Sequence, residues 1–140
     1  MNFNRKNILM TILTALVIGQ TIEASNIIYI QSKSEFEQKV LNNSRPAVLK
    51  FSATWCPPCK RIKGLIEEIA ELHTEVNFVD INFDNFPELS NKYNIRTLPT
   101  LIFLAGPANR KKEITNRHVG SNVSKKELTE KIKRAFNLKK

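Results

Sequence analysis

The sequence predicts an α/β fold in which a mixed central sheet of about five strands is flanked on both faces by about four helices. Three observations lead to this prediction. Strand-like and helical patterns alternate along the first part of the chain, and such alternation requires parallel pairing of the strands. Two further strand patterns, at 100–105 and 113–119, follow each other and predict a hairpin. A last helical pattern comes after the hairpin.

The first half of the domain contains two expected strands and two expected helices. The segment "IIYI" (27–30) is β-branched and aromatic, which predicts a short strand. Ser32 and Glu35 have the spacing of a capping box, so a helix is expected to begin there. "AVLKFSA" (47–53) predicts a buried strand. A helix is expected over about 58–73, because its apolar residues recur at helical spacing: Ile62, Leu65, Ile66, Ile69 and Leu72.

The second half supplies the other elements. "VNFVDINF" (76–83) alternates as a strand does, and Pro87 suits the first turn of a short helix. "TLIFLA" (100–105) has the pattern of a second buried strand, and "EITNRHV" (113–119) that of an edge strand. A second capping box begins at Ser124 and predicts the last helix.

Residues 1–24 have the pattern of a secretory signal peptide. Arg5 and Lys6 precede the uncharged run "ILMTILTALVIG" (8–19), and Ala24 is a small residue at the expected cleavage site. A retained membrane anchor is the alternative, but a spanning helix needs about 20 apolar residues. We therefore expect one domain over 25–140, with no membrane insertion after cleavage.

The net charge of +9 does not by itself exclude any class of function, because the basic residues are spread along the chain. The basic runs are short, and an exported protein meets little nucleic acid. We expect a solvated basic surface and no nucleic-acid partner.

The chain has two cysteines, Cys56 and Cys59, separated by two prolines. A disulfide across so short a loop stabilises a fold little, which leaves redox exchange or metal binding. A metal site is not expected, because His73 and His118 have no ligand spacing and are expected to be surface or helix-end residues. A thiol at a helix N-terminus is favoured as thiolate, so Cys56 is the expected nucleophile and Cys59 the resolving thiol.

The stretch "VLKFSATWCPPCKRIK", followed later by "IRTLPT", resembles the thioredoxin family over 27–136. The resemblance implies a thioredoxin fold, a thiol–disulfide oxidoreductase and no cofactor beyond the cysteine pair. It also implies a cis peptide bond before Pro99, which would face the cysteines. It places the substrate groove at Trp55, Pro57, Leu98, Pro99 and Gly120.

Four positions depart from the family pattern. Pro57 replaces a common glycine and removes a backbone N–H from the turn. Lys50 stands where thioredoxins commonly carry a buried aspartate, and Asp80 stands where many carry a lysine. We expect these two to form an ion pair that serves as proton relay for Cys59, with Lys50 nearer; the alternative is that Lys50 reaches solvent. Gly64 replaces a helix-kinking proline.

The hairpin "LAGPANRKKEITNRHVG" (104–120) is longer than in small thioredoxins and resembles those of exported thioredoxin-like reductases. We therefore predict a monomeric periplasmic or secreted reductase of protein disulfides, supplied by a membrane or soluble redox protein. The alternatives are a disulfide oxidase or isomerase of the same fold, and a non-catalytic binding module or chaperone. An ER-lumen location is the alternative to a bacterial envelope.

Overall fold

The structure is a computed structural model that describes residues 26–106 and 113–139. The predicted signal peptide (1–24) and most of the long hairpin loop (107–112) lie outside the described residues. No helix in the described part of the chain is long and apolar enough to cross a membrane.

The elements follow the predicted order, with each strand end within one residue of its expected position. They are β1 (Ile27–Tyr29), α2 (Lys33–Phe36), η1 (Glu37–Leu41), β2 (Ala47–Ser52), α3 (Pro57–Leu72), β3 (Asn77–Asn82), α4 (Pro87–Lys92), β4 (Thr100–Ala105), β5 (Glu113–Val119) and α5 (Lys125–Phe136). Segment η1 is a turn of π-helix that follows directly on α2. Helix α3 runs unbroken through Gly64.

Both predicted capping boxes hold their helix starts. The Ser32 hydroxyl accepts from the backbone N–H of Glu35 at 3.1 Å, and the Ser124 hydroxyl accepts from that of Glu127 at 3.2 Å. Each bond satisfies one of the N–H groups that a helix start leaves unpaired.

The sheet has the strand order β1-β3-β2-β4-β5. Strands β1, β3 and β2 are parallel, whereas β4 is antiparallel to β2 and β5 is antiparallel to β4. The helical connection between β3 and β4 is therefore not a parallel crossover, although alternation of strand and helix suggests one. Helix α4 is short, and the chain turns back after it.

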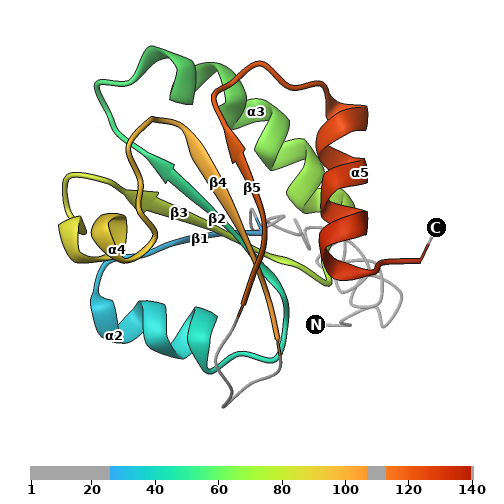
Figure 1. Cartoon of the computed structure of the whole chain (residues 1–140), viewed down its shortest axis with the longest axis horizontal. Helices are drawn as coiled ribbons and strands as arrows, with labels where there is room; N and C mark the ends of the chain where they lie inside the picture. Colours follow the sequence, from blue (N-terminus) through green and yellow to red (C-terminus); the bar gives the residue numbers. More distant parts are fainter. Residues whose placement is uncertain (1–25, 107–112, 140) are drawn as a thin grey trace, which may run out of the picture.

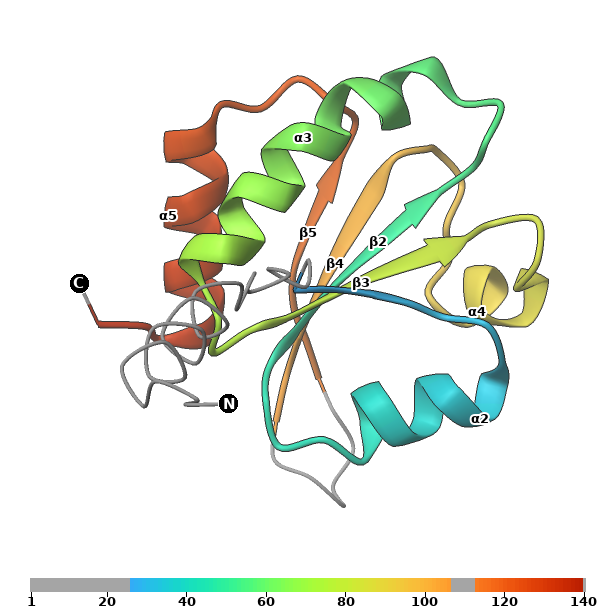
Figure 2. The same cartoon turned by 180° about the vertical axis from the view of Figure 1, so that it is seen from behind.

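Helices cover both faces of the sheet, as Figures 1 and 2 show. One core lies between the sheet and the helices α2 and α4, and the other lies between the sheet and the helices α3 and α5. Alternate residues of β2 enter the two cores: Leu49 and Phe51 face α2 and α4, and Val48 faces α3 and α5. This alternation puts Lys50 on the face that α3 covers.

Candidate active site

The cysteine turn joins the end of β2 to the start of α3. Cys56 is the N-cap of α3 with an extended backbone, and Pro57 is the first helical residue. The backbone N–H of Cys59 donates to the Cys56 Sγ at 3.3 Å. Neither Pro57 nor Pro58 has an N–H to donate, so Cys59 supplies this hydrogen bond from across the turn.

Cys56 and Cys59 form a disulfide with their Cα atoms 5.3 Å apart. Each residue is only 3% exposed, and both pack with Ala53 against Leu98. The pair is thus held in a small apolar cluster at the edge of the sheet.

The peptide bond between Leu98 and Pro99 is cis, as the resemblance implies. Leu98 packs against the cysteine cluster, which brings this bond beside the disulfide. The Pro99 carbonyl accepts from the N–H of Gly120 at 2.8 Å. Gly120 has a φ of 91°, a conformation that a side chain would strain. Its role here is therefore to let β5 end against the cis-proline loop.

A groove of about 260 Å³ opens on the Cys56 side of the disulfide, and we call it the Cys56 groove. The residues that line it are Trp55, Cys56, Pro57, Pro58, Phe83, Arg96 and Leu98. Three of the predicted substrate residues are therefore in this groove: Trp55, Pro57 and Leu98. Pro99 and Gly120 are not among these lining residues, and the N–H of Gly120 donates to the Pro99 carbonyl.

Trp55 is the most exposed large apolar side chain among the described residues, at 63%. Its indole Nε1 donates to Asp84 Oδ2 at 2.8 Å. A hydrogen bond to a carboxylate is stronger than a neutral one, so Asp84 fixes the orientation of an otherwise free ring. The role of Asp84 was not predicted, because nothing in the local sequence links it to a tryptophan 29 positions earlier.

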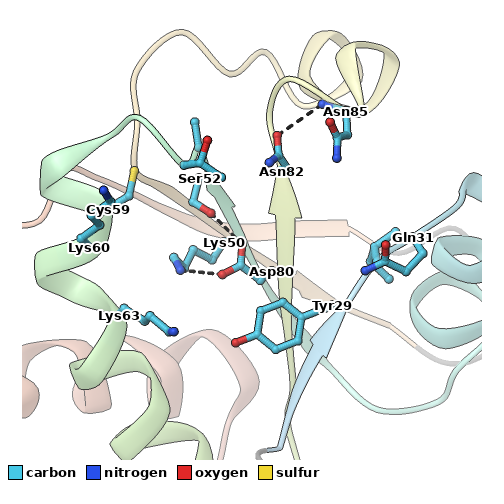
Figure 3. Close-up of a pocket in the computed structure, with 13 residues that line it drawn as sticks. Tyr29, Gln31, Lys50, Ser52, Cys59, Lys60, Lys63, Asp80, Asn82 and Asn85 are labelled. Carbon is cyan, nitrogen blue, oxygen red and sulfur yellow. Dashed lines mark hydrogen bonds and ion pairs between the residues drawn. The ribbon is translucent and has the colours of Figure 1, made fainter.

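A second cavity, of about 400 Å³, lies on the Cys59 side of the disulfide, and we call it the Cys59 cavity. Lys50, Ser52, Cys59 and Asp80 all line it (Figure 3). Lys50 Nζ lies 2.6 Å from Asp80 Oδ2, and the Ser52 hydroxyl donates to Asp80 Oδ1 at 2.6 Å. Both oxygens of the carboxylate are thus engaged.

The predicted ion pair between Lys50 and Asp80 is present, and its side chains are 7% and 15% exposed. Lys50 is buried and paired, so the alternative in which it extends to solvent is wrong. Ser52 was not predicted as part of this site, although it lies two residues after Lys50 on the same strand, β2. Residues i and i+2 of a strand share a face.

The two histidines are separate from this site. His73 caps the C-terminus of α3, as a helix-end residue. His118 is 9% exposed, so the expectation of a surface residue is wrong. No group of three or more His, Cys, Asp or Glu side chains among residues 26–106 and 113–139 is placed to hold a metal ion.

A comparison with protein-family models matches the thioredoxin model to residues 27–134 of this chain. The chain belongs to the thioredoxin family. The thioredoxin of Mycoplasmoides gallisepticum is 32% identical over 105 residues, which cover 75% of this chain and 98% of that protein. Thioredoxin-2 of Saccharomyces cerevisiae is 36% identical over 93 residues, which cover 66% of this chain and 85% of that protein.

Solved thioredoxin structures share the fold. The thioredoxin of Nicotiana alata superposes with a TM-score of 0.67 at 27% identity, covering 84% of this chain and 99% of that one. The thioredoxin of Trichomonas vaginalis gives a TM-score of 0.69 at 20% identity, covering 79% and 98%.

This thioredoxin-family chain is a thiol–disulfide oxidoreductase. Thioredoxins act on protein disulfides through a redox-active disulfide and use no other cofactor, and in this chain that disulfide is Cys56–Cys59. The pair lies between a groove that borders Cys56 and a cavity that borders Cys59. This arrangement is consistent with different roles for the two sulfurs, with one attacking the substrate and the other resolving the mixed disulfide.

Proposed function

We propose that this protein is a monomeric reductase of protein disulfides in the cell envelope. The observation that carries the proposal is the placement of Cys56 at the N-cap of α3, bordering the groove that contains Trp55 and Leu98. The unpaired N–H groups of a helix start favour a thiolate there. The predicted signal peptide (1–24) supports the location.

The reaction begins with the reduced pair. The Cys56 thiolate attacks one sulfur of a substrate disulfide, forming a mixed disulfide, and the other substrate sulfur leaves as a thiolate that takes up a proton. Cys59 then loses its proton and attacks the Cys56 sulfur, which releases the second substrate thiolate. Two electrons pass to the substrate, and the Cys56–Cys59 disulfide is formed. A second dithiol redox protein, membrane-bound or soluble, must return two electrons to it.

The Cys56 groove supplies the binding surface for the substrate. The exposed Trp55 ring and the apolar wall at Leu98 suit an extended chain that lies across Cys56. Pro57 also lines this groove, and its ring keeps the turn rigid. Pro99 and Gly120 act as positioning residues, since their hydrogen bond fixes the loop that carries Leu98.

Lys50 and Asp80 are proposed as the proton relay for Cys59. They share the Cys59 cavity with that residue, and Ser52 holds the carboxylate in place. The Lys50 ammonium lines the same cavity as Cys59 and favours a thiolate there, although Asp80 offsets part of its charge, whereas the missing N–H at Pro57 disfavours a thiolate. The two departures from the family pattern therefore act in opposite directions on the reduced pair.

Reduction of insulin disulfides tests the activity. Wild type with dithiothreitol should reduce insulin, whereas Cys56→Ser should be inactive. Cys59→Ser should accumulate a mixed disulfide with the substrate, which gel electrophoresis without reductant detects. Equal insulin reduction by wild type and Cys56→Ser would refute the proposal and favour a non-catalytic binding module.

Direction and location have their own tests. Equilibration of the pair with glutathione buffers measures the reduction potential, and a value well below that of the glutathione pool supports a reductase, whereas a higher one supports an oxidase or isomerase. N-terminal sequencing of the protein from fractionated cells tests export. A start at Ser25 in the envelope fraction supports it, and an intact Met1 in the cytosol contradicts it.

A further inference from the structure

The Cys59 cavity holds binding groups that thiol exchange does not use. It lies where the parallel strands β1, β3 and β2 end, and ligands bind at this edge in open α/β sheets. Its volume of about 400 Å³ lies within the range of small-molecule sites, which is about 300–1,000 Å³.

The described lining of the cavity has an excess of positive charge. Lys50 reaches it from β2, and Lys60 and Lys63 reach it from α3. Asp80 is the one acid among the described lining residues, and Lys50 already neutralises it. Glu67 lies 3.7 Å from Lys63, but this is an exposed pair along α3, and such pairs contribute little.

Neutral donors surround the same space. Gln31, Asn82 and Asn85, whose side chains end in amides, are also among the lining residues (Figure 3). Asn82 Oδ1 already accepts from the backbone N–H groups of Asp84 and Asn85, so its NH₂ group is the end that remains to donate. In Figure 3, the Tyr29 hydroxyl points toward the space into which Lys63 extends from α3. Ammonium and amide donors around one cavity match an oxyanion.

We propose that the Cys59 cavity binds a small molecule that carries an oxyanion, either a carboxylate or a phosphate. The oxyanion lies between Lys60 and Lys63 on one side and the amides of Asn82 and Gln31 on the other. The Lys50–Asp80 pair forms the floor beneath it. Binding to the oxidised protein does not depend on the proposed reductase function.

The proposal has a redox consequence, and this part rests on the proposed function. Cys59 is part of the cavity wall, so a bound anion disfavours negative charge on the reduced pair. The anion therefore binds the disulfide form more tightly than the thiolate form. By linkage, an occupied cavity favours the disulfide by the same factor and makes the pair a stronger reductant.

An NMR titration of the full-length oxidised chain tests the binding. Inorganic phosphate and acetate are added in separate series, with ionic strength held constant by chloride. The backbone amides of Gln31, Asn82 and Asn85 should shift together and saturate. The Trp55 indole N–H, on the other side of the disulfide, should stay in place. Shifts with phosphate alone identify a phosphate ligand, and shifts with both probes show that a carboxylate suffices.

Variants decide whether the lysines carry the binding. Lys60→Gln with Lys63→Gln should raise the dissociation constant at least about tenfold, because it removes two charged donors. Lys126→Gln, which removes an exposed lysine from α5, is the matched control and should bind as wild type. The proposal is overturned by the lack of a saturable shift with either probe, by equal shifts over the lysines of α5, or by unchanged affinity in the double variant.

Saturating phosphate should also move the equilibrium of the pair with dithiothreitol toward the disulfide by about fivefold in wild type and not in the double variant. Insulin reduction by the double variant in phosphate-free buffer should match wild type. A failure of the binding proposal is thereby distinguished from a failure of the reductase proposal. No change in the redox equilibrium at saturation would overturn the linkage.

Discussion

Lys50 Nζ lies 2.6 Å from Asp80 Oδ2, in direct register across the parallel strands β2 and β3. Ser52 Oγ donates to the other oxygen of the carboxylate at 2.6 Å. The acid and the base are exchanged relative to the pattern that the family resemblance implies, yet the ion pair is kept. A buried ammonium and a buried carboxylate are each costly alone, so exchange of both is far easier to accommodate than exchange of one.

The first prediction concerns the stability that this pair provides. Lys50→Met should lower the free energy of unfolding by about 3 kcal/mol, because it leaves a mostly buried carboxylate without its counter-charge. We place the loss at the low end of the usual range, since Ser52 still donates to Asp80. Urea unfolding measures it.

The reversed pair, Lys50→Asp with Asp80→Lys, is the matched control for that variant. It restores one acid and one base in the same two positions, so most of the lost stability should return. If the double variant were as unstable as the sum of the two single variants, the pair would contribute nothing through its interaction.

The second prediction concerns proton transfer from Cys59. Lys50→Met should slow resolution of the mixed disulfide by about tenfold or more near neutral pH, because it removes the ammonium group that favours a thiolate at Cys59 and that holds the Asp80 carboxylate in the cavity. Stopped-flow measurement of product release over a range of pH shows both the rate and the shape of the profile. A merely structural role for Lys50 predicts the wild-type profile at lower protein stability, and an unchanged profile would end the relay hypothesis.

The third prediction concerns the double proline. Pro57→Gly returns a backbone N–H near the Cys56 sulfur, which has the Cys59 N–H as its donor within the turn. The variant should hold a larger fraction of Cys56 as thiolate at neutral pH, and the pair should become more oxidising. Thiolate absorbance and glutathione equilibration measure the two effects.

Pro57→Ala is the control for that substitution. It returns the same backbone N–H but adds less conformational freedom to the turn than glycine does. If Pro57→Ala left the thiolate fraction at the wild-type value, the effect of Pro57→Gly would come from lost rigidity and not from the new donor beside Cys56.

The fourth prediction concerns the exposed indole. Asp84→Ala should reduce kcat/KM for insulin about fivefold, since the hydrogen bond that orients Trp55 is worth about 1 kcal/mol at an exposed site. The free energy of unfolding should fall by no more than about 1 kcal/mol, because the same hydrogen bond is present in the free folded protein. Trp55→Phe keeps an aromatic ring but loses the N–H.

A double-mutant cycle isolates this contact. Asp84→Ala combined with Trp55→Phe should be no worse than Trp55→Phe alone, because the N–H that Asp84 accepts is already gone. Additive losses would show that Asp84 contributes to substrate binding by a route that does not involve the indole.

The sequence predicted best what depends on local pattern. The cysteines lie at a strand-to-helix junction that periodicity alone reveals, and the capping boxes at Ser32 and Ser124 are complete within four residues. The Lys50–Asp80 pair could also be predicted from the sequence, because two adjacent parallel strands of equal length leave little freedom of register. The cis bond at Pro99 followed from the family resemblance and not from physical reasoning about the chain.

What the sequence did not predict depends on tertiary placement. The Trp55–Asp84 bond requires the loop after β3 to fold back over the cysteine turn, and no periodicity encodes that return. The antiparallel direction of β4 could not be predicted, because a short helix before a strand has the same sequence pattern as the helix of a parallel crossover. The burial of His118 could not be predicted, because the sequence pattern of an edge strand does not indicate which of its residues a later helix covers.

The last prediction follows from the burial of His118 against α5. Burial lowers the pKa of its imidazole, and the nearby positive charge of Lys131, whose Nζ lies 3.2 Å from Nδ1, lowers that pKa further; Glu127 opposes the shift. The unfolded chain therefore binds a proton at His118 more readily than the folded chain does. The contribution of His118 to the free energy of unfolding is fully present above the ordinary pKa of about 6.5. It falls as the pH drops below that value, with a slope of at most about 1.4 kcal/mol per pH unit.

Urea unfolding between about pH 7.5 and about pH 5, the range in which histidine ordinarily titrates, should show this slope in wild type. His118→Gln should flatten it and Lys131→Met should reduce it, whereas Lys126→Met, on the solvent side of α5, should leave it unchanged. A slope that survived in His118→Gln would assign the titration to another group.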